Sequence, residues 1–191
     1  MTRTADHEHW SRVSTEWIAW ARAPNHDAFW AYRDSLIAFI GRGKGEALDV
    51  GCGEGRVSRE LKACGYRVTA SDPVGELVNA AKEARSADDY VIASGTDLPF
   101  RDARFDLVMA YNVLMDVEDV PATIKEIKRV LRPAGMLVVS IVPLFGSRAL
   151  RHCGDNFPLC HPRQLLWLEA LRRYGRARWP ADAFRRVVET A

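Results

Sequence analysis

Short apolar runs alternate with helical patterns through the middle of the chain, from about residue 46 to residue 143. The strands expected from these runs cover residues 47–50, 66–71, 90–93, 107–111 and 136–142. Between them, apolar side chains recur every three or four residues from Arg56, from Leu77 and from Ile124, as on the buried face of a helix. Strands that alternate with helices predict an α/β fold with a doubly wound, mostly parallel sheet.

Residues 1–43 predict two helices ahead of this sheet. The first covers residues 9–22 and carries an apolar stripe of Trp10, Val13, Trp17 and Trp20. The second follows a break at Pro24–Asp27 and turns Phe29, Leu36, Ile37 and Ile40 inward. Two interpretations stay open, because the helices either pack as ordinary core or form a lid over a ligand. A lid would meet its ligand near the break, at Trp20, Arg22, His26 and Asp27.

A glycine turn follows the first strand and leads into a helix. Gly51, Gly53 and Gly55 stand at alternate positions, and Asp49 precedes them. Such a corner lies at the carboxyl end of a parallel strand, where ligands bind in open α/β sheets. The dinucleotide fingerprint G-x-G-x-x-G fails, because its third glycine would fall at Arg56. Asp49 would also repel a pyrophosphate and would favour a cationic ligand.

The run D-x-G-x-G-x-G resembles motif I of the class I S-adenosylmethionine (AdoMet)-dependent methyltransferases, in which the glycine turn packs against the methionine part of AdoMet. Asp72 ends the second expected strand, at the place where nucleotide-binding families hold ribose hydroxyls. Asp72–Pro73 also fits a helix start, and the two readings are compatible. In the family, the segment after the third strand supplies an acidic residue and an apolar residue to adenine, and Asp97 and Leu98 occupy those positions.

Residues 98–106 complete the likeness, because Leu98–Asp106 resembles the "LPFxDxxFD" run that leads into the fourth strand. The resemblance covers about residues 46–143 and is specific to the methyltransferase type 11 family. It implies a Rossmann-like fold and AdoMet-dependent methyl transfer. The implied cofactor-binding residues are Asp49, Gly51, Cys52, Gly53, Asp72, Pro73, Asp97, Leu98, Tyr111 and Asn112. His26, Asp27 and Asp116 are candidates for a general base, but the sequence selects none of them, and the catalytic residues stay unassigned.

The segment 144–191 departs from the family, whose sheet ends in an antiparallel strand pair. It has little two-residue alternation and predicts a helix near Pro162–Tyr174 and a shorter one near Ala181–Thr190. We therefore expect no completed seven-stranded sheet, but a helix beside the fifth strand. Without the strand pair, the sheet would leave an exposed edge that a helix or a second copy of the chain could cover, which is a weak argument for a homodimer. The pairs His152–Cys153 and Cys160–His161 are spaced too widely for a typical zinc site, so no metal is expected.

Length and composition fit one domain, with residues 1–43 as lid, 46–143 as cofactor-binding core and 144–191 as an atypical end. The net charge of +2 divides into −3 before residue 143 and +5 from there on. The C-terminal arginines surround an apolar helical face, which favours a solvated surface over nucleic-acid binding. No run is long enough to cross a membrane and the first residues are polar, so a cytoplasmic protein is expected.

The sequence thus predicts an AdoMet-dependent methyltransferase acting on a small-molecule acceptor. An AdoMet-binding protein without turnover, or a truncated form without an acceptor site, stays open because of the atypical C-terminal segment. An NAD-dependent oxidoreductase is disfavoured by Asp49 and Arg56.

Overall fold

The computed structural model describes residues 5–25, 27–141 and 186–189. Its helices are α1 (Ala5–Arg22), α2 (Ala28–Ile40), α3 (Arg56–Ala63), α4 (Gly75–Glu83) and α5 (Val120–Val130). Its strands are β1 (Glu46–Val50), β2 (Arg67–Asp72), β3 (Asp89–Ile92), β4 (Phe105–Tyr111), β5 (Leu131–Ile141) and β6 (Arg186–Glu189). They form one sheet in the order β3-β2-β1-β4-β5-β6, and every pair of neighbours is parallel. The predicted doubly wound α/β fold is confirmed.

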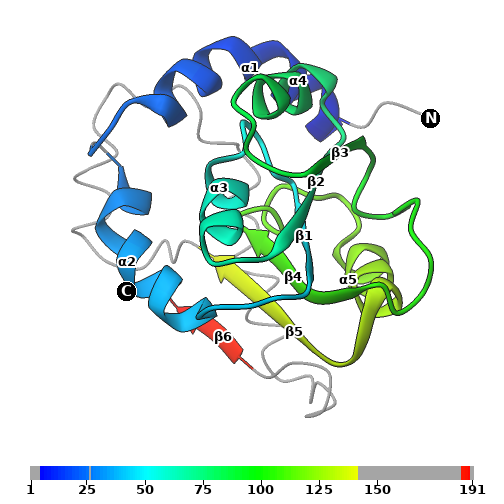
Figure 1. Cartoon of the computed structure of the whole chain (residues 1–191). Coiled ribbons are helices and arrows are strands. Elements are labelled where there is room, and N and C mark those ends of the chain that lie inside the picture. The colour runs from blue at the N-terminus through cyan, green and yellow to red at the C-terminus, as the bar shows by residue number, and fades with distance from the viewer. Residues whose placement is uncertain (1–4, 26, 142–185, 190–191) are drawn as a thin grey trace.

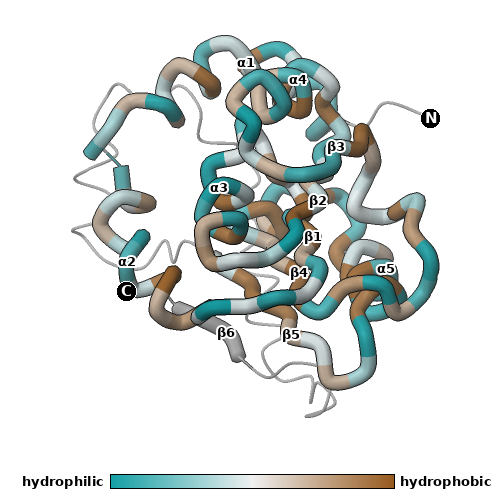
Figure 2. The backbone as a smooth tube through the Cα atoms, in the orientation of Figure 1, coloured by the Kyte–Doolittle hydropathy of each residue, from teal (hydrophilic) through white to brown (hydrophobic). Residues whose placement is uncertain are grey.

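The sheet separates two apolar layers, because side chains alternate between its faces. On one face Ala47, Leu107 and Met109 pack with residues of α2 and α3. On the other face Leu48 and Val108 pack with Ile127 of α5. Figure 1 shows α3 on one side of the strands and α5 on the other, and Figure 2 shows the apolar colour concentrated along the central strands. Strands buried on both faces explain why the sequence shows continuous apolar runs there.

The start of β5 differs from the prediction, which placed the strand at Met136. Leu131 already pairs with Phe105, and the regular register resumes at Leu107 and Met136. Residues 132–135 therefore bulge out opposite a single residue, Asp106, whose carboxylate accepts hydrogen bonds from Arg132. The ion pair of Arg132 with Asp106 therefore stabilises the junction between α5 and β5. Pro133 and Gly135 lie within this bulge and do not separate the helix from the strand.

The prediction of a short helix near Ala181–Thr190 is wrong for residues 186–189. They form β6, which pairs in parallel with β5 from Val138 opposite Arg186 to Ile141 opposite Glu189. The edge of β5 offers unpaired backbone groups, and a strand satisfies them where a helix cannot. The expected helix near Pro162–Tyr174 lies outside the described residues, as does His26.

The helix after β2 also begins later than the Asp72–Pro73 interpretation requires. Asp72 remains the last residue of β2, and α4 starts at Gly75 with Val74 at the N-cap position. The Asp72 side chain still contributes there, because Oδ1 accepts a 2.9 Å hydrogen bond from the Val74 N–H. No helix in the described part of the chain is long and apolar enough to cross a membrane.

Candidate functional site

The glycine turn connects β1 to α3 and has its three glycines at φ +68°, +55° and +87°. Each lies in the left-handed region, where L side chains are strained. At Gly51 a Cβ atom would overlap the Val113 side chain from the segment after β4. At Gly53 the nearest atom to such a Cβ is Nε1 of Trp17, 3.3 Å away. The middle of the turn therefore faces α1, with the Trp17 indole directly above it.

Asp72 joins this turn to the end of β2. Its Oδ2 accepts a hydrogen bond from the Gly53 N–H at 3.0 Å, and the carboxylate is 6% exposed. Burial raises the Asp72 pKa to about 6, although its two backbone hydrogen bonds and the nearby His7 oppose the shift. At neutral pH the carboxylate is therefore mainly ionised and fixed at the carboxyl edge of the sheet.

An apolar side chain lies exposed beside this carboxylate. Ile92 pairs with Asp72 across β2 and β3 and is 56% exposed. It is the large hydrophobic residue that stands out as exposed among the described residues. An apolar surface beside a fixed acidic group is an arrangement that suits a nucleoside, whose base is flat and whose ribose carries hydroxyls.

Asp49 lies in a different environment from Asp72. It is 1% exposed, and its Oδ2 accepts a 2.5 Å hydrogen bond from the Ser58 hydroxyl of α3. Its position in β1 puts it on the same face as Ala47, toward α3. Burial raises the Asp49 pKa to about 7, the hydrogen bond from Ser58 lowers it and the nearby Asp72 raises it. Asp49 thus forms the floor of the turn beneath α3.

Arg56, the first residue of α3, connects the turn to both N-terminal helices. It donates hydrogen bonds of 2.6 Å to Oδ2 of Asp27 and to the carbonyl of Ala21. The guanidinium carbon lies 4.6 Å from the Phe29 ring centroid, and the Trp17 and Trp20 rings lie at 6.0 and 5.7 Å. Trp17 and Trp20 stack on each other with centroids 5.0 Å apart. We call Arg56, Asp27, Trp17, Trp20 and Phe29 the arginine cage.

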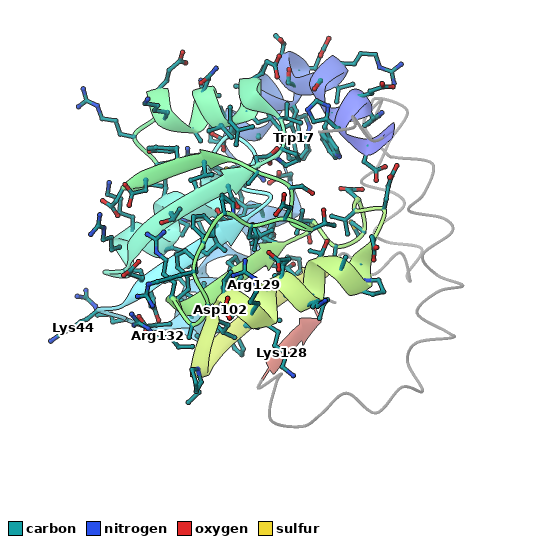
Figure 3. All side chains as sticks on the ribbon, turned by 90° about the vertical axis from the view of Figure 1, so that its right-hand side faces the viewer. Trp17, Lys44, Asp102, Lys128, Arg129 and Arg132 are labelled. Carbon is teal, nitrogen blue, oxygen red and sulfur yellow. The ribbon has the colours of Figure 1, made fainter. Side chains whose placement is uncertain are left out.

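The arginine cage shows how α1 is held over the carboxyl edge of the sheet. Arg22 at the end of α1 also donates a 3.0 Å hydrogen bond to the Ala80 carbonyl of α4. Figure 1 shows α1 running beside α4 across that end of the molecule. In Figure 3, Trp17 lies at this end, while Lys44 and Arg132 lie at the opposite end. The tryptophan stripe is half-buried, and Trp17 is the member that lies between α1 and the glycine turn.

The tip of β4 carries Tyr111 and Asn112. The Tyr111 ring meets Phe29 edge-on with centroids 5.9 Å apart, and burial raises its pKa to about 12. Asn112 has φ +56°, and its Oδ1 accepts a 3.0 Å hydrogen bond from the Ser140 hydroxyl of β5. The left-handed backbone turns the chain sharply at the end of the strand, so that Val113 reaches Gly51.

Asp97 and Leu98 lie on the segment between β3 and β4. Asp97 is exposed, whereas Leu98 is 2% exposed and belongs to the apolar layer under α5. The Leu98 N–H donates to Glu126, and Arg129 donates to the Leu98 carbonyl. Arg129 also bonds Asp102, as the two neighbouring labels in Figure 3 indicate. Helix α5 thereby fixes the backbone that presents Asp97.

The structure brings the predicted residues Gly51, Cys52, Gly53, Asp72 and Pro73 together at one corner, with Tyr111 and Asn112 at the end of the adjacent β4. Cys52 is tied to this corner by a hydrogen bond from its N–H to the Ser71 carbonyl. Sequence reasoning missed the roles of Arg56 and Trp17. The position of Arg56 directly after the third glycine was the available signal. No group of three or more metal-ligating side chains occurs in the part of the chain that the structure describes.

Comparisons with known proteins agree with this geometry. Residues 48–139 match the family model Methyltransf_11, described as a methyltransferase domain. Malonyl-[acyl-carrier protein] O-methyltransferase of Enterobacter lignolyticus is 34% identical over 142 residues, which cover 72% of this chain and 56% of that protein. The protein of the same name from Pseudescherichia vulneris is 37% identical over 103 residues, covering 53% and 41%. The chain thus spans about half the length of these relatives.

Solved structures share the fold over more of the chain. The cyclase SpnF aligns with a TM-score of 0.62 at 25% identity, covering 92% of this chain and 73% of that chain. A Thermotoga maritima protein described as a methyltransferase dependent on S-adenosylmethionine aligns with a TM-score of 0.60 at 20% identity, covering 78% and 68%. The second likeness concerns the fold alone. The glycine turn, Asp72 and the tip of β4 all lie within the residues that the family model matches.

Proposed function

We propose that this chain, a class I AdoMet-dependent methyltransferase of the type 11 family by its match to the family model over residues 48–139, transfers the methyl group of AdoMet to a small-molecule acceptor. The observation that carries this proposal is the hydrogen bond from Gly53 to Asp72, which places an ionised carboxylate beside an open glycine turn. The exposed Ile92 next to Asp72 adds an apolar surface for the adenosine.

The donor atoms of the site suit AdoMet. Each Asp72 oxygen accepts one backbone hydrogen bond and keeps a lone pair, so the carboxylate can also accept from two ribose hydroxyls. In our assignment Gly51, Cys52 and Gly53 contact the methionine part, while Asp97, Leu98 and Pro73 lie along the adenosine. Leu98 would take part through its backbone or an edge of its side chain, since the side chain is packed under α5.

A buried acid beneath the turn would favour a positively charged sulfonium. Asp49 lies beneath the turn, and its pKa near 7 would fall if a cation bound nearby. Tyr111 and Asn112 stand at the tip of β4, where we place the reacting methyl group. AdoMet supplies an activated methyl group when it is bound. The chain would add alignment of the acceptor and exclusion of water, for which the arginine cage holds α1 over the site.

The domain boundaries follow from the same proposal. Residues 46–143 would hold the cofactor and residues 1–43 would form the lid. The curated relatives are named for a protein-bound malonyl acceptor, but the chain spans only about half of their length. We therefore propose a small acceptor that fits under α1, and we treat transfer to an acyl carrier protein as an outcome of the experiment below.

A second function is favoured by one comparison. The SpnF structure, which covers 92% of this chain, is described as a cyclase. The fold alone therefore does not determine methyl transfer. A protein that binds AdoMet without transferring its methyl group is the alternative. An NAD-dependent oxidoreductase fits less well, because the negative charge of Asp49 lies beneath the turn that would bind a pyrophosphate, and because Arg56 stands where the fingerprint requires its third glycine.

Titration calorimetry of the full chain with AdoMet and with NAD tests the ligand. Binding of AdoMet alone supports the site, and binding of NAD alone contradicts it. Transfer of a radiolabelled methyl group to a small-molecule extract, or to malonylated acyl carrier protein, then tests the reaction. Label in the small-molecule fraction supports the proposal, whereas label only in the carrier protein contradicts the acceptor class. Binding without any transfer favours the second function.

A further inference from the structure

A half-buried carboxylate with one buried oxygen that has no hydrogen-bond partner in the described part of the chain lies on the loop after β4. Within the described residues, Oδ1 of Asp116 is buried and receives no hydrogen bond. The Asp116 N–H donates a 2.9 Å hydrogen bond to the carbonyl of Val113, the residue whose side chain packs against Gly51. Asp116 therefore lies one tight turn away from the segment that contacts the glycine turn.

The other acids of this region already have partners. Asp49 accepts from Ser58 and Asp72 accepts from two backbone N–H groups. Asp27 also has a buried Oδ1 without a partner among the described residues, but its charge is paired with Arg56 through Oδ2. A buried carboxylate without a donor is costly to the fold and needs an explanation. At the edge of a ligand site, the donor that the chain does not provide can come from the substrate.

The charge around Asp116 is negative. Asp6, in the first turn of α1, is 6% exposed and is the charged group that acts on the Asp116 carboxyl. Burial first, and then Asp6, raise the Asp116 pKa to about 7. A general base works best when its pKa lies near the working pH. No cation among the described residues forms an ion pair with Asp116.

We propose that Asp116 accepts the proton of the methyl acceptor, and that the acceptor is a hydroxyl or an ammonium group rather than an ionised carboxylate. This inference rests on the proposed methyl transfer. The inference also extends the proposed methyl transfer, because the sequence selected no base among His26, Asp27 and Asp116.

The proton and electron balance is simple. A hydroxyl oxygen attacks with a lone pair that it already has, whereas an ammonium nitrogen must first give a proton to the base, which frees its lone pair. That lone pair forms the bond to the methyl carbon, while the carbon–sulfur bond breaks and its electron pair stays on sulfur. The acceptor's proton moves to Oδ1 of Asp116 and later to water. An ionised carboxylate has no proton to give and would meet the like charges of Asp116 and Asp6. The pair therefore selects against acidic acceptors as well as assisting the transfer.

The acceptor class can be tested before the acceptor is identified. The full chain is incubated with methyl-labelled AdoMet and a small-molecule extract, and the labelled products are treated with alkali. A methyl ester releases labelled methanol, whereas an ether or a methylamine keeps its label. Alkali-stable label is the expected result. Alkali-labile label overturns the proposal, and no label although AdoMet binds overturns the proposed methyl transfer on which it rests.

The role of Asp116 is tested with the fraction of the extract that contains the acceptor, identified by its labelled product, as the substrate. Asp116→Asn should lower kcat by about 100-fold or more, the range for loss of a general base, and leave the Kd for AdoMet unchanged. Glu118→Gln is the matched control, since Glu118 is an exposed acid on the same loop, and it should keep its activity within about threefold. Activity of Asp116→Asn within threefold of the parent overturns the assignment.

Two further readouts separate a chemical role from a structural one. In the parent protein kcat should rise as pH increases through about 7, and this rise should disappear in Asp116→Asn. Without substrate, the infrared carboxyl band that Asp116→Asn removes should titrate with a midpoint near 7. A band that titrates near 4, with an unchanged pH profile, contradicts the proposal. Loss of AdoMet binding by the parent would instead mark failure of the proposed function itself.

Discussion

The backbone N–H of Gly53 donates a 3.0 Å hydrogen bond to Oδ2 of Asp72, so the end of β2 holds the middle of the glycine turn. The carboxylate that would bind the ribose also fixes the backbone that would contact the methionine part. Asp72 therefore has a structural role besides the proposed ribose binding, because it is 6% exposed and also accepts a hydrogen bond from Val74. A change at Asp72 must alter both stability and affinity.

We expect Asp72→Asn to weaken AdoMet binding by about 1.5–3 kcal/mol, the range for hydrogen bonds to a charged group. The free energy of unfolding should also fall by about 1–3 kcal/mol, since a buried backbone N–H loses a good acceptor. Calorimetry and urea unfolding measure the two effects. Asp88→Asn is the control, because Asp88 accepts from the Val68 N–H near the other end of β2. It should cost stability alone, and an equal loss of affinity would contradict the ribose assignment.

Gly53→Ala should abolish most of the AdoMet affinity. The added methyl group would lie on a residue with left-handed backbone at φ +55°, 3.3 Å from Nε1 of Trp17, in the space between the turn and α1. Gly41→Ala provides a matched control, because Gly41 has φ +70° and no atom lies within 4 Å of the position that its Cβ would take. Both variants should lose about 1 kcal/mol of stability through backbone strain. Equal affinity of the two variants would show that the turn only connects β1 to α3.

Arg56→Lys should loosen α1 and α2 without unfolding the sheet. Lysine keeps the charge but cannot bond Asp27 and the Ala21 carbonyl with one planar fork. We expect hydrogen exchange of the amides in residues 8–22 to accelerate at least about tenfold, equivalent to about 1.4 kcal/mol. Arg59→Lys is the comparison, since Arg59 lies one turn further along α3 and, among the described residues, donates its side-chain hydrogen bonds to Glu54. Similar hydrogen-exchange rates in the two variants would show that the arginine cage does not stabilise the position of α1.

The sequence was informative where local pattern determines the structure. The strands β1 to β4 and the helices between them follow from apolar periodicity, and the turn follows from its glycines. Asp72 could be assigned to the end of β2 for the same reason. The burial of Asp49 was also within reach, because alternation along β1 puts it on the face of Ala47 toward α3.

The remaining features depend on contacts between distant segments. Arg56 meets Asp27 and Ala21, which precede it by 29 and 35 residues, so no local pattern reveals the cage. The segment that forms β6 was predicted as helix, because its state is decided by pairing with β5 and not by its own sequence. The sequence left Asp116 as one of three candidate bases, because the burial of its Oδ1 depends on the tertiary structure.

The free energy of unfolding should decrease as the pH rises from about 5 to about 8. Burial raises the pKa values of Asp49, Asp72 and Asp116 to about 7, 6 and 7, from 3.8 in the unfolded chain. The native protein therefore binds more protons than the unfolded chain in this window, and the stability of the protonated forms is lost as pH rises through the native pKa values. Below about pH 4 the trend reverses, because hydrogen bonds from Arg129 hold the Glu126 pKa at about 2.

Urea unfolding at several pH values measures this trend. We expect the free energy of unfolding to fall by at least about 1.4 kcal/mol between pH 5 and pH 8, the value of a single unit of pKa shift. Asp116→Asn should flatten this slope, whereas Glu118→Gln should not. Greater stability at pH 8 than at pH 5 would mean that these carboxyl groups are solvated in the native protein.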